Sequence, residues 1–140
     1  MTILKKWTIA AAVVMIALLS SCQTNDPTVE SFTRDYTVRQ NMWDVWSDDS
    51  GDYFYYTFKE PNLTSNVYNN GVMVAYLLMN DGTLSPLPFN DYWSYGTYMG
   101  TEQVSCEFLP GSVTFILKYS DHDSSRDPYY DYTFRVRFMW

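Results

Sequence analysis

Cysteine and histidine are scarce in this chain, which has two cysteines and one histidine among 140 residues. The sequence contains no Cys-x-x-Cys pair, His-Glu-x-x-His helix, Gly-x-Ser-x-Gly turn or glycine-rich phosphate loop. It therefore carries none of the short motifs that identify common enzymes. We predict that the protein is not an enzyme and has no cofactor.

Basic residues and long apolar runs are scarce as well. Nine lysines and arginines stand against sixteen aspartates and glutamates, so the formal net charge is −7. This balance opposes binding to nucleic acid and to anionic membrane surfaces. The apolar run from Trp7 to Leu19 has 13 residues, whereas a membrane-spanning helix needs about 20.

The N-terminus has the layout of a secretory signal. Lys5 and Lys6 precede the apolar run, and small residues end it at Leu19-Ser20-Ser21-Cys22. The segment resembles the lipobox of bacterial lipoproteins, in which the cysteine becomes the lipidated first residue. The resemblance implies that residues 1–21 are a signal peptide and that Cys22 carries a diacylglyceryl group and an acyl chain such as palmitate. The alternative is an ordinary cleaved signal with a chance cysteine.

Cleavage before Cys22 would change the rest of the chain. It would leave 119 residues, enough for one domain, and the loss of Lys5 and Lys6 would lower the charge to −9. The lipid would anchor the protein without spanning the membrane. Gln23 is not the aspartate that marks inner-membrane retention in enterobacteria, which favours the outer membrane and leaves the leaflet open.

Cys106 is then left without a disulfide partner. It lies in an alternating segment, Val104 to Phe108, where a small buried apolar residue is the expected role. A catalytic Cys106–His122 pair is the alternative.

The remaining sequence predicts an all-β domain. Residues 22–33 are the lipidated cysteine and a polar tether, and residues 34–140 are the folded domain. Alternation predicts strands over 52–59, 112–119 and 132–140, and an apolar run predicts a central strand over 71–79. Weaker strands are predicted over 36–45, 84–88, 92–98 and 102–109. Together these strands predict an antiparallel β-sandwich of about eight strands, with a barrel as the alternative.

One helix and two turns interrupt these strands. Thr64 is expected to cap a short helical crossover near 64–70, which Gly71 closes, with Leu63 and Val67 on its buried side. Asn80-Asp81-Gly82 and the segment from Asp48 to Asp52 are predicted turns.

A longer stretch carries a second resemblance. Residues 61–72, Pro-Asn-Leu-Thr-Ser-Asn-Val-Tyr-Asn-Asn-Gly-Val, resemble the Pro-x-Leu-Thr-x-x-Val-x-x-x-Gly segment of short Bacteroidetes lipoproteins. Trp43, Leu87-Pro88 and the strand start at 109–115 match further parts of that pattern, and the match covers residues 36–140. It implies a small all-β domain in the cell envelope. The group has no assigned function, so the resemblance carries over no catalytic residue.

Aromatic residues are unusually frequent in the chain, which has 13 Tyr, 8 Phe and 5 Trp. Tyr92, Trp93, Tyr95 and Tyr98 form a cluster, flanked by Asn90 and Asp91, that is hard to place in a core. Aromatic faces stack on sugar rings, and Trp43 and Trp46 are candidates to join such a platform. The alternative is a twisted edge hairpin that covers the sandwich.

Two acidic segments are candidate cation sites. Asp121, Asp123 and Asp127 place oxygen ligands as a Ca²⁺ loop begins, but the sixth position is Arg126 and the twelfth is Tyr132. The segment from Asp48 to Asp52 is a hairpin turn first and a cation site second.

These observations predict a lipid-anchored protein of the bacterial envelope that serves as a structural or interaction module, with a glycan or an envelope protein as partner. The first alternative is a glycan-binding accessory protein, and the second is a hydrolase that uses two facing carboxylates.

Overall fold

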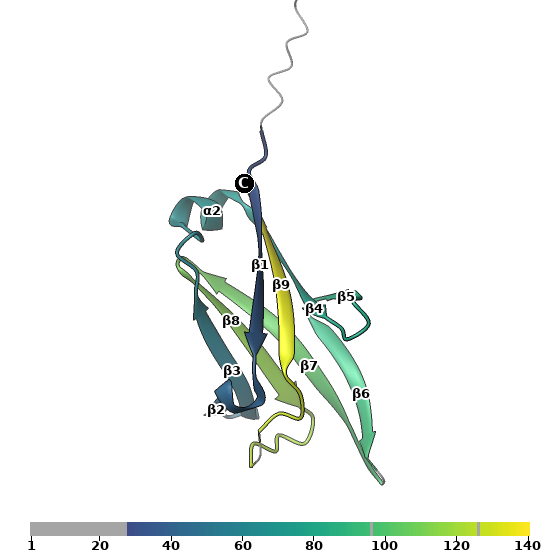
Figure 1. Cartoon of the computed structure of the whole chain (residues 1–140). Coiled ribbons are helices and arrows are strands. Elements are labelled where there is room, and N and C mark those ends of the chain that lie inside the picture. Colours follow the sequence, from purple (N-terminus) through teal and green to yellow (C-terminus); the bar gives the residue numbers. More distant parts are fainter. Residues whose placement is uncertain (1–27, 96, 126) are drawn as a thin grey trace, which may run out of the picture.

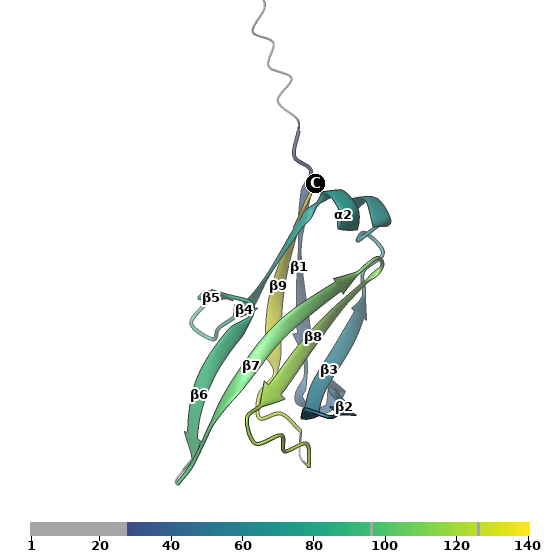
Figure 2. The ribbon, with the colours of Figure 1, turned by 180° about the vertical axis from the view of Figure 1, so that it is seen from behind.

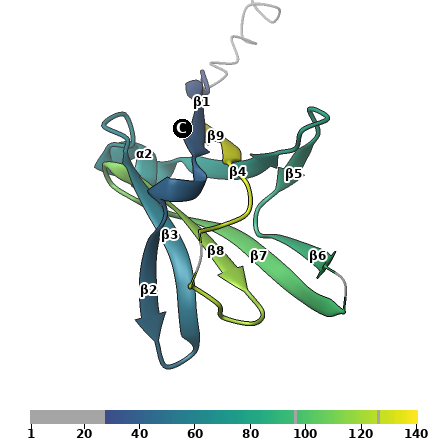
Figure 3. The same cartoon turned by 60° about the horizontal axis from the view of Figure 1, so that its bottom comes forward.

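The computed structural model describes residues 28–95, 97–125 and 127–140, which form an antiparallel β-sandwich. One sheet has the order β1-β9-β4-β5 and the other β2-β3-β8-β7-β6 (Figures 1 and 3). The strands are β1 (Ser31–Val38), β2 (Asp44–Asp48), β3 (Gly51–Lys59), β4 (Val72–Leu78), β5 (Leu84–Pro86), β6 (Phe89–Tyr95), β7 (Tyr98–Leu109), β8 (Ser112–Tyr119) and β9 (Tyr132–Met139). A 3-10 turn, η1 (Gln40–Met42), and one helix, α2 (Ser65–Asn70), complete the described part.

Alternating apolar residues of β8 and β9 build the core between the sheets. Phe115 and Phe134 are fully buried and stack across the interface, with ring centroids 3.9 Å apart. Phe138 stacks on Phe32 of β1 and meets Phe108 of β7 edge on. The aromatic residues of the sequence thus bind the two sheets together.

The predicted sandwich is confirmed, as are β3, β8 and β9 and the short helix. Thr64 Oγ1 accepts a hydrogen bond from the Val67 amide, and the Gly71 amide donates to the Val67 carbonyl. Gly71 has an extended backbone. A Cβ there would lie 2.5 Å from the Val67 oxygen and 2.6 Å from the Met139 oxygen, so close packing requires glycine.

The structure differs from the prediction at the start of β1, within the segment 36–45, at the predicted strand 92–98, which is divided between β6 and β7, and in the burial of β4. β1 begins at Ser31, inside the predicted tether 22–33, because Glu30 and Trp140 exchange backbone hydrogen bonds and extend the sheet to the domain's first residues. The predicted strand 36–45 is divided by η1 into β1 and β2. β4 is not buried on both sides, because only its inner face, with Ala75 and Leu77, meets the core.

The two ends of the sandwich differ in composition. The described chain begins at 28–30 beside Trp140 and α2, at what we call the terminal end (Figures 1 and 2). The opposite, distal end holds the β2–β3 turn, the β6–β7 hairpin and loop 120–131. Aspartates concentrate there, at positions 44, 48, 49, 52, 121, 123, 127 and 131. No helix among the described residues is long and apolar enough to cross a membrane.

Candidate functional site

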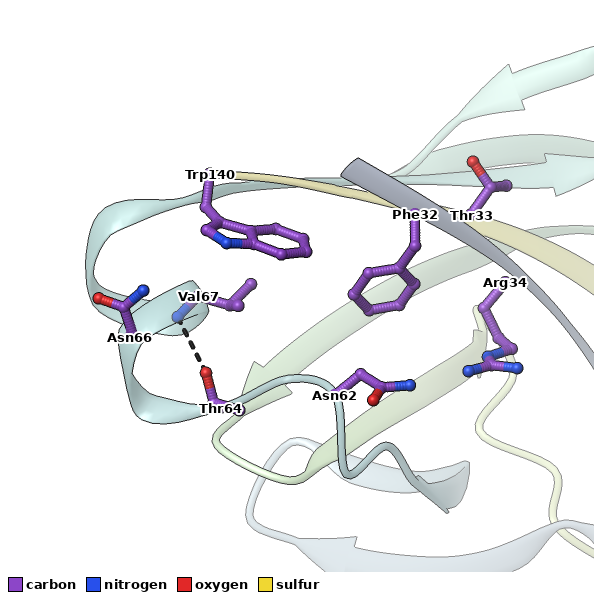
Figure 4. A pocket seen from close by; sticks show the side chains of 8 residues that line it. All are labelled: Phe32, Thr33, Arg34, Asn62, Thr64, Asn66, Val67 and Trp140. Carbon is purple, nitrogen blue, oxygen red and sulfur yellow. Dashed lines mark hydrogen bonds between the residues drawn. The ribbon is translucent and has the colours of Figure 1, made fainter. Parts of the chain in front are cut away.

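A pocket of about 550 Å³ opens at the terminal end, between β1 and the crossover that leads into α2. Figure 4 shows the rings of Phe32 and Trp140 on one side of it and Asn62 and Thr64 on the other. The two rings meet edge on, with centroids 5.8 Å apart. The Arg34 side chain closes one end and points toward Asn62. Thr33, Asn66 and Val67 complete the lining.

A buried carboxylate beside this pocket fixes its geometry. Glu60 is 2% exposed, and its Oε2 accepts hydrogen bonds from Arg34 Nε at 3.1 Å and from the Tyr36 hydroxyl at 2.8 Å. Its Oε1 accepts the Asn62 amide at 3.2 Å. Burial acts to raise the pKa of Glu60, but these hydrogen bonds outweigh burial and hold the pKa below its ordinary value. Burial raises the pKa of Tyr36, and the hydrogen bond to the Glu60 carboxylate raises it further.

The chemistry of the pocket suits a neutral polar molecule. Glu60 balances the charge of Arg34, so the pocket offers an anion little net attraction. The side-chain amide of Asn62 can donate to a ligand and accept from it, and that of Asn66 can donate. Thr64 Oγ1 already accepts from the Val67 amide, and Asn66 Oδ1 already accepts from Asn70. Phe32 and Trp140 add an apolar wall.

Sequence reasoning missed this site. Glu60 lies between Lys59 and Pro61, which is a pattern typical of a solvated loop, and nothing local indicates that Tyr36 and Arg34 will meet it. A detectable signal was the alternation from Phe32 to Val38, which extends the strand toward the N-terminus and gives Phe32, Arg34 and Tyr36 one face.

The predicted aromatic cluster forms the edge hairpin of the five-stranded sheet. β6 pairs only with β7 among the described strands, and Tyr92, which is 59% exposed, lies opposite Thr101. The backbones of Trp93, Tyr95 and Tyr98 belong to the hairpin, and their side chains lie outside the described part. Of the four candidate residues, the structure therefore places the Tyr92 side chain alone on the surface.

The two tryptophans expected beside the cluster lie in different environments. Trp43 is not part of an exposed platform, because it is 8% exposed and packs edge on against Tyr132 in the core. Its indole Nε1 has no hydrogen-bond partner in the described structure. Trp46 is 55% exposed and lies opposite Tyr53.

The acidic loops are organised by their own hydrogen bonds. Among the residues that the structure describes, no three carboxylate, histidine or cysteine side chains are grouped so that they could hold a metal ion, and Asp121, Asp123 and Asp127 are not brought together in such a group. Asp121 instead accepts the Asp123 amide, and Asp123 accepts the Ser125 amide. The segment from Asp48 to Asp52 is the predicted hairpin turn, in which Asp48 pairs with Gly51.

Cys106 and His122 do not form a pair. Cys106 lies on the inner face of β7 opposite Phe115, where burial raises the pKa of its thiol. His122 lies in the distal loop against Gly51. Cys106 is partly buried against the core, less than the full burial predicted for it, and lines a groove of about 340 Å³ with Met73 and Phe108.

Two carboxylates do meet in a small pocket of about 200 Å³ near the distal end. Asp91 and Glu102 are directly paired on β6 and β7, and both line this pocket. Burial raises the pKa of Glu102, and the charge of Asp91 raises it further, against a 2.9 Å hydrogen bond from the Tyr132 hydroxyl. Next to them, burial raises the pKa of Tyr119 to about 12.

No family model, curated protein or solved structure matches the chain.

Proposed function

We propose that this chain is a lipoprotein of the bacterial envelope, held in the outer membrane by a lipid on Cys22, and that its sandwich is an interaction module. One observation carries the proposal. The described chain begins beside its C-terminal residue at the terminal end, so a lipid on Cys22 is six residues from Thr28 and about 20 Å from the domain at most.

The distribution of charge supports this orientation. Aspartates crowd the distal end, whereas exposed apolar residues occur at both ends, with Val29, Tyr68 and Leu109 at the terminal end and Met99 and Tyr130 at the distal end. An anionic membrane surface repels carboxylates, so the distal end would face away from the membrane. The resemblance of residues 61–72 to short Bacteroidetes lipoproteins agrees with an envelope location.

The anchor is tested by labelling cells that express the full chain with radioactive palmitate. The expected result is a labelled protein in the membrane fraction, no label in Cys22→Ala, and full label in Cys106→Ala, which removes the other cysteine. Label that persists in Cys22→Ala would contradict the proposal. Protease treatment of intact cells then determines which leaflet carries the domain.

The paired carboxylates of Asp91 and Glu102 favour a second candidate function, a carboxylate-dependent hydrolase. Glu102, with its raised pKa, would be the acid, and Asp91 the second carboxylate. Release of reducing ends from polysaccharides by the full chain, lost in Glu102→Gln and kept in Glu107→Gln, would support it. Glu107 is an exposed acid on the same strand, so its variant controls for the loss of charge. If the full chain releases no reducing ends, the hydrolase function is excluded.

A further inference from the structure

The outer face of the five-stranded sheet carries a row of side chains that crosses all five of its strands. Trp46 pairs with Tyr53, Lys118 with Gln103, and Gln103 with Asn90. Phe54 of β3 pairs with Leu117 of β8, and Tyr53 and Lys118 are their next neighbours along the two strands. The Lys118 ammonium lies 4.7 Å from the centre of the Tyr53 ring. Residues that are far apart in sequence thus lie side by side.

The alternation of each strand directs this row away from the core. Phe54, Leu117 and Val104 are buried and lie next in sequence to Tyr53, Lys118 and Gln103. Successive side chains of a strand point to opposite faces, so the row faces solvent. Trp46 is more than half exposed, and Gln103 and Asn90 are also exposed.

Further rings flank the row on both sides. Tyr55 and Ile116 are paired on one side of it. Tyr92 and Thr101 are paired on the other side, toward the hairpin tip. The face therefore has an aromatic end on β2 and β3, hydrogen-bonding side chains on β8, β7 and β6, and a second ring at Tyr92.

We propose that this row binds a neutral polysaccharide, whose chain runs across the strands from Trp46 toward Tyr92. A sugar ring has an apolar C–H face, which Trp46 and Tyr92 can cover, and hydroxyls that both donate and accept. The amides of Gln103 and Asn90 also donate and accept, and the Lys118 ammonium donates. Strands lie about 4.8 Å apart, so the row spans about 19 Å and has room for several sugar units.

Charge and polarity separate this ligand from other occupants. A protein partner would be expected to bury a central apolar cluster, but the centre of this row is polar. The net charge of the chain and Asp44 and Asp48 beside Trp46 oppose polyanions, including nucleic acid and acidic polysaccharides. Neither argument opposes a neutral chain of sugars, which needs no apolar cluster and carries no charge.

The inference rests on the role of the domain as an interaction module and not on the lipid at Cys22. A chain that takes up palmitate but binds no polysaccharide would keep the anchor and remove the inference. A chain that binds polysaccharide but takes up no palmitate would keep the inference and remove the anchor.

The test is affinity electrophoresis of the full chain, extracted in mild detergent, in native gels that contain one polysaccharide each. The neutral probes are hydroxyethyl cellulose, laminarin and yeast mannan, and the acidic probe is polygalacturonate. We expect retardation by at least one neutral probe, at low and high salt alike. Trp46→Ala is expected to weaken that binding about ten-fold or more, equivalent to about 1.4 kcal/mol.

Tyr130→Ala is the matched control, because Tyr130 is 66% exposed but lies in the distal loop, away from the row. It is expected to bind as the wild type does, whereas Tyr92→Ala and Lys118→Gln are each expected to bind more weakly. No retardation by any neutral probe would overturn the inference, as would retardation by polygalacturonate alone. Equal loss in Trp46→Ala and Tyr130→Ala would also overturn it. So would a wild-type dimer that Trp46→Ala converts to monomer, because the face would then join two copies of the chain.

Discussion

The outer face of the four-stranded sheet pairs charged and hydroxyl side chains across its strands, whereas the row from Trp46 to Asn90 on the outer face of the five-stranded sheet leaves its two amide side chains unpaired. On the first face, Arg135 donates two hydrogen bonds to Asp35, at 2.8 and 2.7 Å, and the hydroxyls of Thr37 and Thr133 share a third. On the second face, the hydroxyls of Thr57 and Thr114 share one hydrogen bond at 2.9 Å, but the side chains of the paired residues Gln103 and Asn90 form none in the described structure. A surface that already pairs its own groups has less to offer a ligand.

This difference separates stability from recognition. The cross-strand pairs on the four-stranded sheet hold β1 against β9, and they should contribute to folding. The free amides and the exposed ring of Trp46 on the five-stranded sheet contribute little to folding, and they remain available for binding.

The largest expected effect falls on the core that both faces share. Phe134→Ala removes a fully buried ring from its stack with Phe115 and should lower the free energy of unfolding by about 3–5 kcal/mol. Urea unfolding, followed by tryptophan fluorescence and by circular dichroism, measures the loss. Coincident transitions would show that the sheets unfold together, and separate transitions would mean that the two faces belong to independent units.

The next effect concerns the polar link between the sheets. Glu60→Gln weakens the hydrogen bonds from Tyr36 and Arg34 and should cost about 1.5–3 kcal/mol at pH 7. Because folding lowers the pKa of Glu60 below its ordinary value of 4.5, its contribution is present above that pH and is lost as the pH falls through the lowered value.

Urea unfolding of the wild type and of Glu60→Gln at pH 7 and pH 3 tests this sign. The difference between the two proteins should shrink at pH 3. Tyr36→Phe removes one of the hydrogen bonds and should produce a smaller loss at pH 7. A difference that grows at low pH would contradict the assignment.

A smaller effect is expected on the four-stranded face. Arg135→Ala removes the ion pair with Asp35, whose pKa the Arg135 hydrogen bonds lower. Both side chains are partly exposed, so the loss of stability should be less than that of Glu60→Gln and should fade in concentrated salt. Polysaccharide retardation should be unchanged, and a weaker retardation would break the distinction between the two faces.

The smallest effect on stability is expected on the five-stranded face. Trp46→Ala should change the free energy of unfolding by no more than about 0.5 kcal/mol, because the side chain is exposed on an edge strand. Urea midpoints of this variant and of the wild type make the comparison. A large loss would assign Trp46 to the fold and not to recognition.

Local patterns in the sequence predicted the strands whose one face is buried. Tyr132 to Met139 and Ser112 to Tyr119 alternate without interruption, and both became central strands. The crossover was equally local, because Thr64 and Gly71 bracket the helix. The start of β1 was missed although Phe32 to Val38 alternate, and the pairing that places Ser31 in the sheet is with the distant Met139.

The candidate sites depend on long-range pairing and could not be predicted in the same way. Trp43 and Trp46 are three residues apart, but Trp46 lies opposite Tyr53 on the outer face of β2, whereas Trp43 ends the η1 turn and packs against the distant Tyr132 in the core. The row from Trp46 to Asn90 needs four strand pairings at once. Glu60 gained its buried role from Arg34 and Tyr36, which lie 26 and 24 residues earlier.

The distinction between the two outer faces is tested most directly by amide NMR of the full chain in detergent micelles, titrated with the neutral polysaccharide that retards it most. The account predicts shifts at Tyr53, Gln103 and Asn90 on the five-stranded face, and none at Thr133 or Arg135 on the four-stranded face. Shifts confined to the four-stranded face, or no shift on either face at saturating polysaccharide, would contradict it.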